Sequence, residues 1–317
     1  MLDTFKALSD VTRLRLVGVL SNGEFTVQEL TAVLAMGQSR ISRHLKILFD
    51  AGILSVKRQG TWAYYRLKGD NGFFLEIWPA MERSLDCQAL RKRDQERVTE
   101  ILESRRRRSL EFFDRHARQW DDFTRNLLSF PSYLDALLNE IPACRTIVEV
   151  GVGTGNALAA LSCKAPQVVG VDHSPAMLDQ ARSRVSQECL SGVEFRLGEM
   201  SHLPVGDSEV DCLLLNMVLH HAAQPDRVFQ EARRILGPGG RLVIADLQRH
   251  DQDWVREKLA DQWLGFERKE LEGWLTGAGF SCGRFVPVSG MAGQQDVFIL
   301  AAERMDDLQT TYQTNKE

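Results

Sequence analysis

Three glycines spaced two residues apart follow an apolar run in the segment VEVGVGTGN, residues 148–156. A buried strand that opens into a glycine-rich turn is typical of α/β folds that bind a nucleotide beside the end of that strand. The spacing departs from the dinucleotide pattern G-x-G-x-x-G, because the third glycine comes one place early and Asn156 stands where it is expected. The segment therefore predicts a nucleotide-type loop but leaves the ligand open.

Two carboxylates beside this loop narrow the choice of ligand. Glu149 precedes the glycines, and Asp172 ends a second apolar strand, 168–171, 21 residues after Gly151. A carboxylate next to the loop repels a pyrophosphate, whereas it suits a ligand with an ammonium and a sulfonium group. A carboxylate after the second strand can accept both hydroxyls of a ribose. These residues favour S-adenosylmethionine (SAM), or S-adenosylhomocysteine (SAH), which fits the same pocket.

Strand-like and helix-like segments alternate through the second half of the chain. This alternation predicts an α/β, Rossmann-like domain with a parallel sheet and helices between the strands. The expected strands are 194–197, 210–216, 241–247 and a closing pair at 281–288 and 297–303, and the expected helices include 177–189 and 226–236.

This half resembles the class I SAM-dependent methyltransferases over roughly residues 112–303, with a pattern nearest to the branch of quinone and small-molecule methylases. The segments that carry the resemblance are VEVGVGTGN, GVDHSPAMLDQAR, GEMSHLPV, VDCLLLNMVLHH and LGPGGRLVIADL. It implies a SAM or SAH pocket. It assigns Glu149, Gly151, Gly153 and Gly155 to the methionine part, Asp172 to the ribose, His173, Met177, Glu199 and Met200 to the adenine, and Asn216, Met217 and His220 to the sulfonium end.

The first third of the chain has a different charge and a different pattern. Residues 1–110 carry 19 lysines and arginines against 13 acidic residues, whereas residues 111–317 carry 20 against 30. Apolar spacing predicts a helix over VQELTAVLA, a turn closed by Gly37, and a second helix that Ser39 caps and Gly52 ends. Two short strands follow around Gln59 and Gly60. Together these elements predict an α+β winged helix-turn-helix with a polyanion partner.

The second helix of this motif is expected to enter the major groove of double-stranded DNA. Its N-terminal half carries polar and cationic side chains that can reach base edges, and other cations are better placed for phosphates. Which residues touch bases stays open. The expected base-edge group is Gln38, Ser39, Arg40, Ser42, Arg43 and His44, and the expected phosphate group is Lys46, Lys57, Arg58 and Thr61.

These residues also resemble the ArsR/SmtB family of winged-helix repressors, across nearly all of residues 3–68. The resemblance rests on FKALSDVTRLRLVGVL, GEFTVQEL, QSRISRHLKIL and KRQGTWAYYRL. It implies a dimer that binds operator half-sites and releases them when a ligand binds. Metal sensors of this family carry two cysteines on the helix before the reading helix. The matching positions here are Thr26 and Gln28, so the familiar metal trigger lacks its thiolates.

Helix-forming residues connect the two halves. We expect a short helix at 73–85 and a longer one from 89 to Trp120. In the family such helices form the dimer interface, so the candidates for that interface are Phe73, Phe74, Ile77 and Trp78. The expected domains are a winged helix-turn-helix at 1–72, connecting and dimerisation helices at 73–111, a SAM/SAH-binding methyltransferase-fold domain at 112–305 and a tail at 306–317.

The sequence gives little support for a membrane protein, a disulfide-rich protein or a metalloprotein. Charges interrupt the first twenty residues, and no apolar run approaches the ~18 residues of a membrane span, so we expect a cytoplasmic protein without a membrane partner. The six cysteines form no C-x-x-C pair, which argues against a zinc ribbon or a disulfide framework. A metal site made by His220, His221, His250 and Asp246 is considered, but none is expected.

The sequence leaves two functions open. The favoured one is a dimeric DNA-binding regulator, a repressor, whose second domain binds SAM or SAH as an effector through linkage. This fusion resembles the SAH-responsive repressors of the methionine cycle. The alternative is an active SAM-dependent methyltransferase acting on a small molecule, with an autoregulatory DNA-binding domain. Methyl transfer often needs a base, and no catalytic signature identifies one. The candidates are His220, His221, Asp246, His250 and Asp251.

Overall fold

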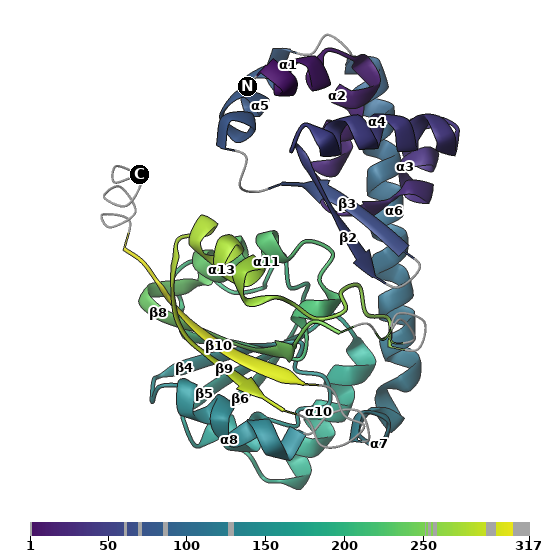
Figure 1. Cartoon of the computed structure of the whole chain (residues 1–317). Coiled ribbons are helices and arrows are strands. Elements are labelled where there is room, and N and C mark those ends of the chain that lie inside the picture. Colours follow the sequence, from purple (N-terminus) through teal and green to yellow (C-terminus); the bar gives the residue numbers. More distant parts are fainter. Residues whose placement is uncertain are drawn as a thin grey trace. The chain divides into compact units, whose positions relative to one another are not determined.

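Figure 1 shows the computed structural model of the 317-residue chain, whose described residues are 2–59, 62–68, 72–84, 88–125, 130–250, 252, 255, 259–289 and 296–306. They divide into two compact units, Met1–Arg107 and Arg108–Glu317, which are described separately. The expected tail lies outside the described residues from position 307 onward. None of the helices in the described part of the chain is long and apolar enough to cross a membrane.

Unit 1 confirms the predicted winged helix-turn-helix. Its three strands form an antiparallel sheet in the order β1-β3-β2. The hairpin pairs Gln59 with Trp62 next to its tip, where the reversal was predicted, although Gly60 and Thr61 lie outside the described residues. The elements are α1 (Leu2–Leu8), α2 (Val11–Leu20), β1 (Phe25–Thr26), α3 (Val27–Leu34), α4 (Gln38–Asp50), β2 (Leu54–Gln59), β3 (Trp62–Leu67), α5 (Gly72–Ser84) and α6 (Gln88–His116).

The turn between α3 and α4 differs from the prediction. Ala35 takes a left-handed conformation, with φ 52°, and reverses the chain directly after α3. Gly37 is therefore extended (φ −65°, ψ 145°) and is itself the N-cap of α4, which begins at Gln38. The prediction that Gly37 closes the turn and Ser39 caps the helix is wrong, because Ser39 already lies in the first helical turn. Gly52, with φ 69°, follows the end of α4 as predicted.

Helix α5 contributes to the core of unit 1. Phe74 and Trp78 are 0% and 6% exposed and pack with the apolar faces of α2, α3 and α4. Their own chain covers most of both side chains, and their part in a dimer interface stays a prediction. The other two candidates, Phe73 and Ile77, are half-buried.

Three polar side chains attach helix α6 to unit 1. Asp94 accepts two hydrogen bonds from the Arg15 guanidinium of α2, at 2.7 Å from Nε and 2.6 Å from Nη2. Arg97 donates to a backbone carbonyl of α3 at 2.8 Å. Arg105 donates to Glu29 of α3 at 2.6 Å. The long helix is thus held to both neighbouring helices along several of its turns.

Helix α6 ends earlier than predicted. It stops at His116, and a 3₁₀ turn, Ala117–Gln119, separates it from α7 (Trp120–Arg125). Ala117 is buried in a cluster with Phe113 and Met177. The rings of Phe113 and Trp120 meet with centroids 5.2 Å apart. The backbone changes from an α-helix to a 3₁₀ turn where it packs around this cluster, so the prediction that the helix continues to Trp120 is wrong.

Unit 2 contains a seven-stranded sheet in the order β6-β5-β4-β7-β8-β10-β9. The first five strands are parallel, whereas β10 is antiparallel to both β8 and β9. The predicted parallel sheet and its closing pair are confirmed, and within that pair only β10 runs against the other strands, because the connection from β9 joins neighbouring strands and reverses the chain direction. The elements are α8 (Phe130–Glu140), β4 (Thr146–Val150), α9 (Leu158–Ser162), β5 (Gln167–Asp172), α10 (Pro175–Gln187), β6 (Val193–Leu197), β7 (Val210–Asn216), α11 (Pro225–Ile235), β8 (Leu236–Leu247), α13 (Arg268–Gly277), β9 (Phe280–Val288) and β10 (Val297–Arg304).

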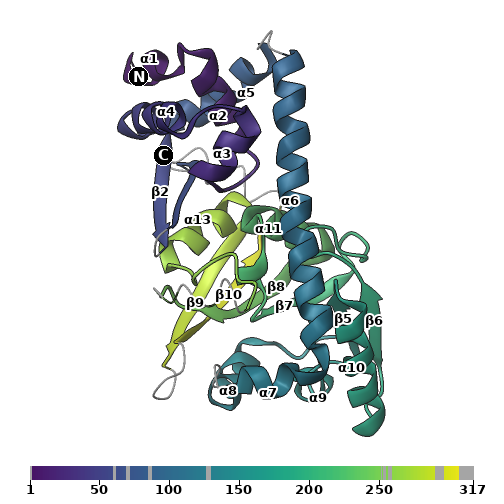
Figure 2. The same ribbon diagram turned by 90° about the vertical axis from the view of Figure 1, so that its right-hand side faces the viewer.

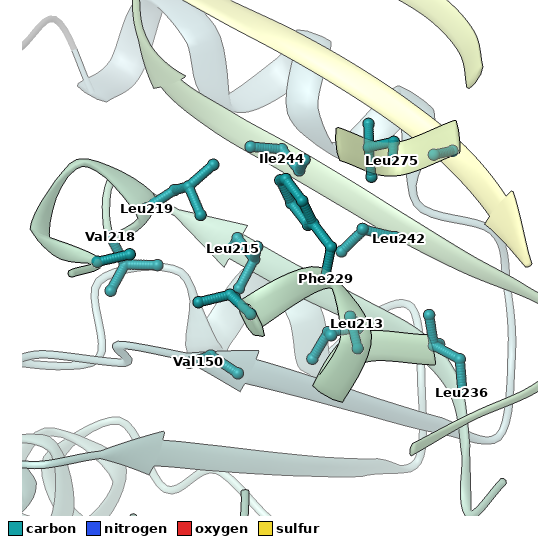
Figure 3. Packing of buried hydrophobic residues seen from close by; sticks show 14 of the residues in the cluster. Val150, Leu213, Leu215, Val218, Leu219, Phe229, Leu236, Leu242, Ile244 and Leu275 are labelled. Atoms are coloured by element: carbon teal, nitrogen blue, oxygen red, sulfur yellow. The ribbon is translucent and has the colours of Figure 1, made fainter. Parts of the chain in front are cut away.

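Helices cover both faces of this sheet (Figure 2). Alternate strand residues pack with α11 and α13 on one face and with α8, α9 and α10 on the other. In Figure 3, Phe229 of α11 lies over Leu213 and Leu215 of β7 and over Leu242 and Ile244 of β8. Because both faces are buried, the strands are apolar along most of their length. Polar side chains therefore collect where the strands end.

Candidate functional site

The glycine loop begins directly after β4. Gly151, Gly153 and Gly155 take left-handed backbone conformations, with φ of 69°, 53° and 83°, which favour glycine. A Cβ atom at Gly151 would lie 2.2 Å from Cγ2 of Val218, whereas at Gly153 the nearest atom would be a carbonyl oxygen 3.9 Å away. The loop is therefore closely packed at its start and open beside Gly153, where a ligand can approach the backbone.

Asp172 stands at the end of β5 and holds this loop. One carboxylate oxygen accepts the backbone N–H of Gly153 at 2.9 Å, and the other accepts that of Ser174 at 2.9 Å. The residue is 6% exposed. Each oxygen of a carboxylate has a further lone pair. The group that orders the loop can therefore still accept hydroxyl groups from a ligand.

Glu149 is buried at the end of the neighbouring strand β4. Asn216 of β7 donates to its Oε1 at 3.4 Å, and Tyr133 of α8 donates to the Asn216 amide oxygen at 3.1 Å. Oε2 is buried and receives no hydrogen bond from the described residues. Burial, together with the charge of Asp172, raises the pKa of Glu149 to about 8 against the opposing effect of the hydrogen bond from Asn216. An unsatisfied buried carboxyl beside a glycine loop fits a ligand that brings a cationic group.

The side chains predicted for the adenine follow β5 and β6. His173 Nδ1 lies 3.4 Å from Asp172 Oδ1, and its Nε2 is buried without a hydrogen bond from the described residues. Burial acts to lower the pKa of His173, but its hydrogen bond to Asp172 and the nearby charges prevail and raise it. Met177 is buried, and Glu199 and Met200 are half-buried. Their contact with an adenine stays a prediction.

The residues predicted for the sulfonium end lie where β7 stops. Met217 has φ 52°, which is uncommon for a residue with a side chain, and its N–H donates to the Ala245 carbonyl of β8 at 2.7 Å. Such backbone strain clusters at functional sites. Asn216, one residue earlier, bonds Glu149. These two predicted residues thus lie next to the carboxylate and the glycine loop.

Three of the predicted base candidates come together in a buried cluster. His220 Nδ1 lies 2.7 Å from Asp246 Oδ1, and its Nε2 lies 3.7 Å from Asp261 Oδ1. His221 Nδ1 lies 3.7 Å from the same Asp261 oxygen. Burial acts to lower the pKa of His220, but the charges of Asp246 and Asp261 outweigh it and raise the pKa to about 9. Burial and the charge of His220 hold the pKa of His221 well below its ordinary value.

The other base candidates are placed differently. His250 is half-buried, its N–H donates to the Leu264 carbonyl at 3.1 Å, and its Nδ1 accepts the N–H of Gln252 at 3.2 Å. It does not belong to the histidine cluster. Asp251 lies outside the described residues. Asp261, which no sequence pattern indicated, joins the cluster instead.

The C-terminal end of α6 reaches the same region and was missed by the sequence analysis. The ring of Phe113 packs edge-on against the rings of His173 and His221, with centroids 5.6 and 4.9 Å apart. Asp114, the next residue, accepts a hydrogen bond from the Ser174 hydroxyl at 2.5 Å. Nothing in the helical pattern around these residues indicates what the helix packs against, so no sequence signal identified them.

Helix α4 of unit 1 has one buried and one exposed face. Ile41, Leu45 and Leu48 are buried. His44 is half-buried, with Nδ1 3.7 Å from Asp10 Oδ1. Burial outweighs the attraction to Asp10 and lowers the pKa of His44, so it adds no charge near a phosphate at neutral pH. The other predicted contact residues on this helix are all exposed, and they are Gln38, Ser39, Arg40, Ser42, Arg43 and Lys46.

The structure does not describe the side chains of the predicted contacts on the hairpin. Lys57 and Arg58 belong to β2, but their side chains are not among those described, and Thr61 is not described at all. Arg66 of β3 donates to the Ser55 hydroxyl at 3.1 Å. The contribution of the hairpin to DNA binding therefore stays a prediction.

Comparison with known families assigns each unit. Residues 10–56, from the N-cap of α2 into β2, match the family described as bacterial regulatory protein, arsR family. Residues 148–244, from β4 into β8, match the family described as methyltransferase domain. The chain joins an arsR-type helix-turn-helix to a class I methyltransferase domain. The order of the seven strands in unit 2 is typical of SAM-dependent methyltransferases of this class.

Relatives of this fusion protein cover only part of it. An arsenite methyltransferase of Halobacterium salinarum is 40% identical over 105 residues, which are 32% of this chain and 27% of that protein. A demethylmenaquinone methyltransferase of Clavibacter sepedonicus is 33% identical over 100 residues, 32% of this chain and 40% of that protein. This chain spans 27%, 34% and 62% of the length of the first three curated relatives.

A solved structure agrees with the fold of unit 2. A chain from the complex between the Haloferax volcanii Trm112 methyltransferase activator and a putative methyltransferase superposes with a TM-score of 0.52 at 20% identity. The match covers 61% of this chain and 98% of that one. At this level of identity the similarity shows the fold alone.

Proposed function

We propose that the chain is a dimeric DNA-binding transcriptional regulator, a repressor, whose methyltransferase domain binds SAM or SAH as its effector. The exposed cations of α4 would contact the operator. Glu149, the glycine loop and Asp172 would hold the methionine part and the ribose of the ligand. The unsatisfied buried oxygen of Glu149 and the open space beside Gly153 support this choice of ligand. When bound, SAM supplies an electrophilic methyl group.

One observation carries the regulatory part of the proposal. Helix α6 runs for 29 residues without a break and contributes side chains to both units. Asp94 and Arg105 bond to unit 1, whereas Phe113 and Asp114 contact His173 and Ser174 beside the glycine loop. A ligand that shifts these contacts acts directly on a helix that is built into the DNA-binding unit. Linkage then requires that DNA shift the affinity for the ligand by the same factor.

The decisive experiment measures DNA binding and methyl transfer side by side. Operator DNA is first selected from a random pool, and its affinity for the full chain is measured with no ligand, with SAM and with SAH. We expect one of the two ligands to change the affinity by about 5- to 150-fold. Labelled SAM incubated with cell extract reports any methyl transfer. If label is transferred and neither ligand alters DNA affinity, the regulator proposal fails.

The second candidate function is catalytic. The methyltransferases among its relatives support it, and the bond between His220 and Asp246 would orient an imidazole as a base. The chain would then methylate a small molecule, and its helix-turn-helix would regulate its own gene. Label transfer that depends on His220 and is insensitive to DNA favours this second function.

Replacing Arg43 by alanine is expected to weaken operator binding by about 5- to 150-fold, because a bidentate arginine contact to guanine contributes about 1–3 kcal/mol. Arg43 is exposed on the N-terminal half of α4, and its removal leaves the buried face of the helix intact. Fluorescence anisotropy with labelled operator measures the effect. Arg182→Ala, on α10 of unit 2, is the matched control. An operator affinity of Arg43→Ala equal to that of the control contradicts the assignment of α4.

Ligand binding is expected to release a proton from Glu149. Burial raises the pKa of Glu149 to about 8, so the carboxyl is largely protonated at neutral pH and must ionise to pair with an ammonium group. Affinity for SAH should therefore rise with pH, by up to about tenfold per unit, and level off above pH 8. Titration calorimetry in two buffers of different ionisation enthalpy gives the number of protons released when the ligand binds. Glu149→Gln should bind more weakly and release none, and an unchanged proton count in that variant would contradict the assignment.

A further inference from the structure

The cluster of His220, His221 and Asp261 has the chemistry of a metal site. Both histidines follow β7 in the short 3₁₀ turn Leu219–His221, and Asp261 comes from the segment that precedes α13. One ligand atom from each residue lies within 4.8 Å of the other two. His220 and Asp261 are 5% and 4% exposed. Segments far apart in the sequence thus converge on one buried point.

The distances suit a small tetrahedral ion. His220 Nε2 and His221 Nδ1 each lie 3.7 Å from the same oxygen of Asp261. Zinc-to-ligand bonds of about 2.0–2.2 Å place neighbouring ligand atoms about 3.3–3.6 Å apart. The two distances to Asp261 therefore need to contract by only a few tenths of an ångström, and the two histidine nitrogens already lie within 4.8 Å of each other. A metal would replace the weak contact of 3.4 Å between His221 Nδ1 and the Ala260 carbonyl.

A fourth residue has the geometry of a support for this site. Asp246, which is fully buried, lies 2.7 Å from His220 Nδ1. When Asp246 accepts the Nδ1–H, the lone pair of Nε2 faces Asp261. A carboxylate that orients a histidine from behind is the usual companion of a metal-bound imidazole. The arrangement therefore presents His220 in the tautomer that a metal requires.

Charge balance favours a divalent ion at this point. Two buried carboxylates, Asp246 and Asp261, face the imidazole of His220 from opposite ring nitrogens. A single proton on His220 compensates one of these carboxylates, whereas a divalent cation with two neutral histidines would compensate both. Buried charges are expensive unless they are compensated. Two imidazoles and one carboxylate suit Zn²⁺ and related first-row ions, and Mg²⁺ or Ca²⁺ prefer oxygen ligands.

We propose that His220, His221 and Asp261 bind a divalent transition metal of the zinc type, with Asp246 orienting His220. His220 is also one of the residues predicted for the sulfonium end, so this site would adjoin the adenosyl site, but metal binding does not depend on the proposed ligand or on the operator. The competing interpretation is a metal-free ion pair in which protonated His220 links the two carboxylates.

Cobalt tests the proposal on the full chain. After exposure to a chelator and buffer exchange, the wild-type protein is titrated with Co²⁺, whose visible absorption reports four-coordinate geometry. We expect uptake of one equivalent, displacement by Zn²⁺ and no displacement by Mg²⁺. Zn²⁺ should also raise the temperature of thermal unfolding. Absence of uptake by the wild-type protein overturns the proposal and supports the metal-free ion pair, whatever the variants do.

Variants locate the bound ion. His221→Gln and Asp261→Asn should abolish the cobalt spectrum, and Asp246→Asn should lower the affinity by about 10- to 100-fold. His202→Gln, which changes an exposed histidine of the same unit, is the matched control and should behave as the wild type. Circular dichroism verifies that each variant is folded. An undiminished cobalt spectrum in folded Asp261→Asn overturns the assignment. A charge-transfer band that shows a cysteine thiolate bound to the cobalt overturns it as well.

Discussion

Replacing Asp172 by alanine is expected to reduce the affinity for SAM and SAH by about 100-fold or more. The carboxylate accepts the backbone N–H groups of Gly153 and Ser174, and its remaining lone pairs are those proposed for the ribose hydroxyls. Hydrogen bonds to a charged acceptor contribute about 1.5–3 kcal/mol each, so losing two of them exceeds 100-fold. Isothermal titration calorimetry measures the effect directly. Binding to operator DNA in the absence of ligand should stay unchanged.

The control for this prediction is Asp179→Ala. Asp179 is an exposed aspartate on α10, the helix that follows Asp172 in the chain, and its carboxylate accepts a hydrogen bond from Arg182 at 2.9 Å. Its removal should leave ligand affinity within about twofold of the wild type, because exposed pairs contribute little. Asp172→Asn retains one acceptor oxygen, so its ligand affinity should lie between that of Asp172→Ala and that of Asp179→Ala. Loss of basal DNA binding in Asp172→Ala would contradict the separation of the two sites.

Replacing Asp94 by alanine is expected to lower the free energy of unfolding of unit 1 by about 3–5 kcal/mol. Removal of one partner of a buried ion pair is strongly destabilising, and Arg15 would lose both of its bonds to the carboxylate. The side chains of Arg15 and Asp94 are 16% and 6% exposed. Urea unfolding, followed by circular dichroism and tryptophan fluorescence, measures the change.

An exposed ion pair in the same unit provides the comparison. Lys46 and Asp50 of α4 are 3.0 Å apart, with side chains 75% and 54% exposed. Asp50→Ala should cost less than about 1 kcal/mol, because water solvates both charges when they separate. Substituting Arg15 by Met and Asp94 by Leu together should recover much of the loss, since a well-packed apolar pair often replaces a buried ion pair without cost. Equal losses in Asp94→Ala and Asp50→Ala would contradict the assigned burial.

Local sequence patterns predicted the elements that depend on neighbouring residues. The glycines after β4 and the apolar face of α4 follow from backbone freedom and helical periodicity, and both are found where they were expected. The turn before α4 was misjudged because Ala35 adopts a left-handed conformation that a glycine usually takes. The sequence analysis placed the closing strands but not their direction, because the same strand pattern fits a parallel and a mixed sheet until the connections are traced.

The candidate site shows what a sequence pattern cannot supply. Motifs placed Glu149 and Asp172 at adjacent strand ends, because both follow apolar strands of a recognisable fold. Tyr133, Phe113 and Asp261 lie on segments whose own residues carry no comparable motif. Only tertiary packing brings Tyr133 to the amide that bonds Glu149, and Asp261 to the paired histidines. Their identification required the arrangement of the chain in space.

The uninterrupted course of α6 restricts how this protein can change in length. Asp94 and Arg105 of this helix both bond to neighbouring helices of unit 1. One residue added between them would turn Arg105 by about 100° around the helix axis and move it by about 1.5 Å along the axis, away from Glu29. Descendants that keep both contacts are therefore expected to keep the number of residues between them, whereas surface loops accept insertions more readily.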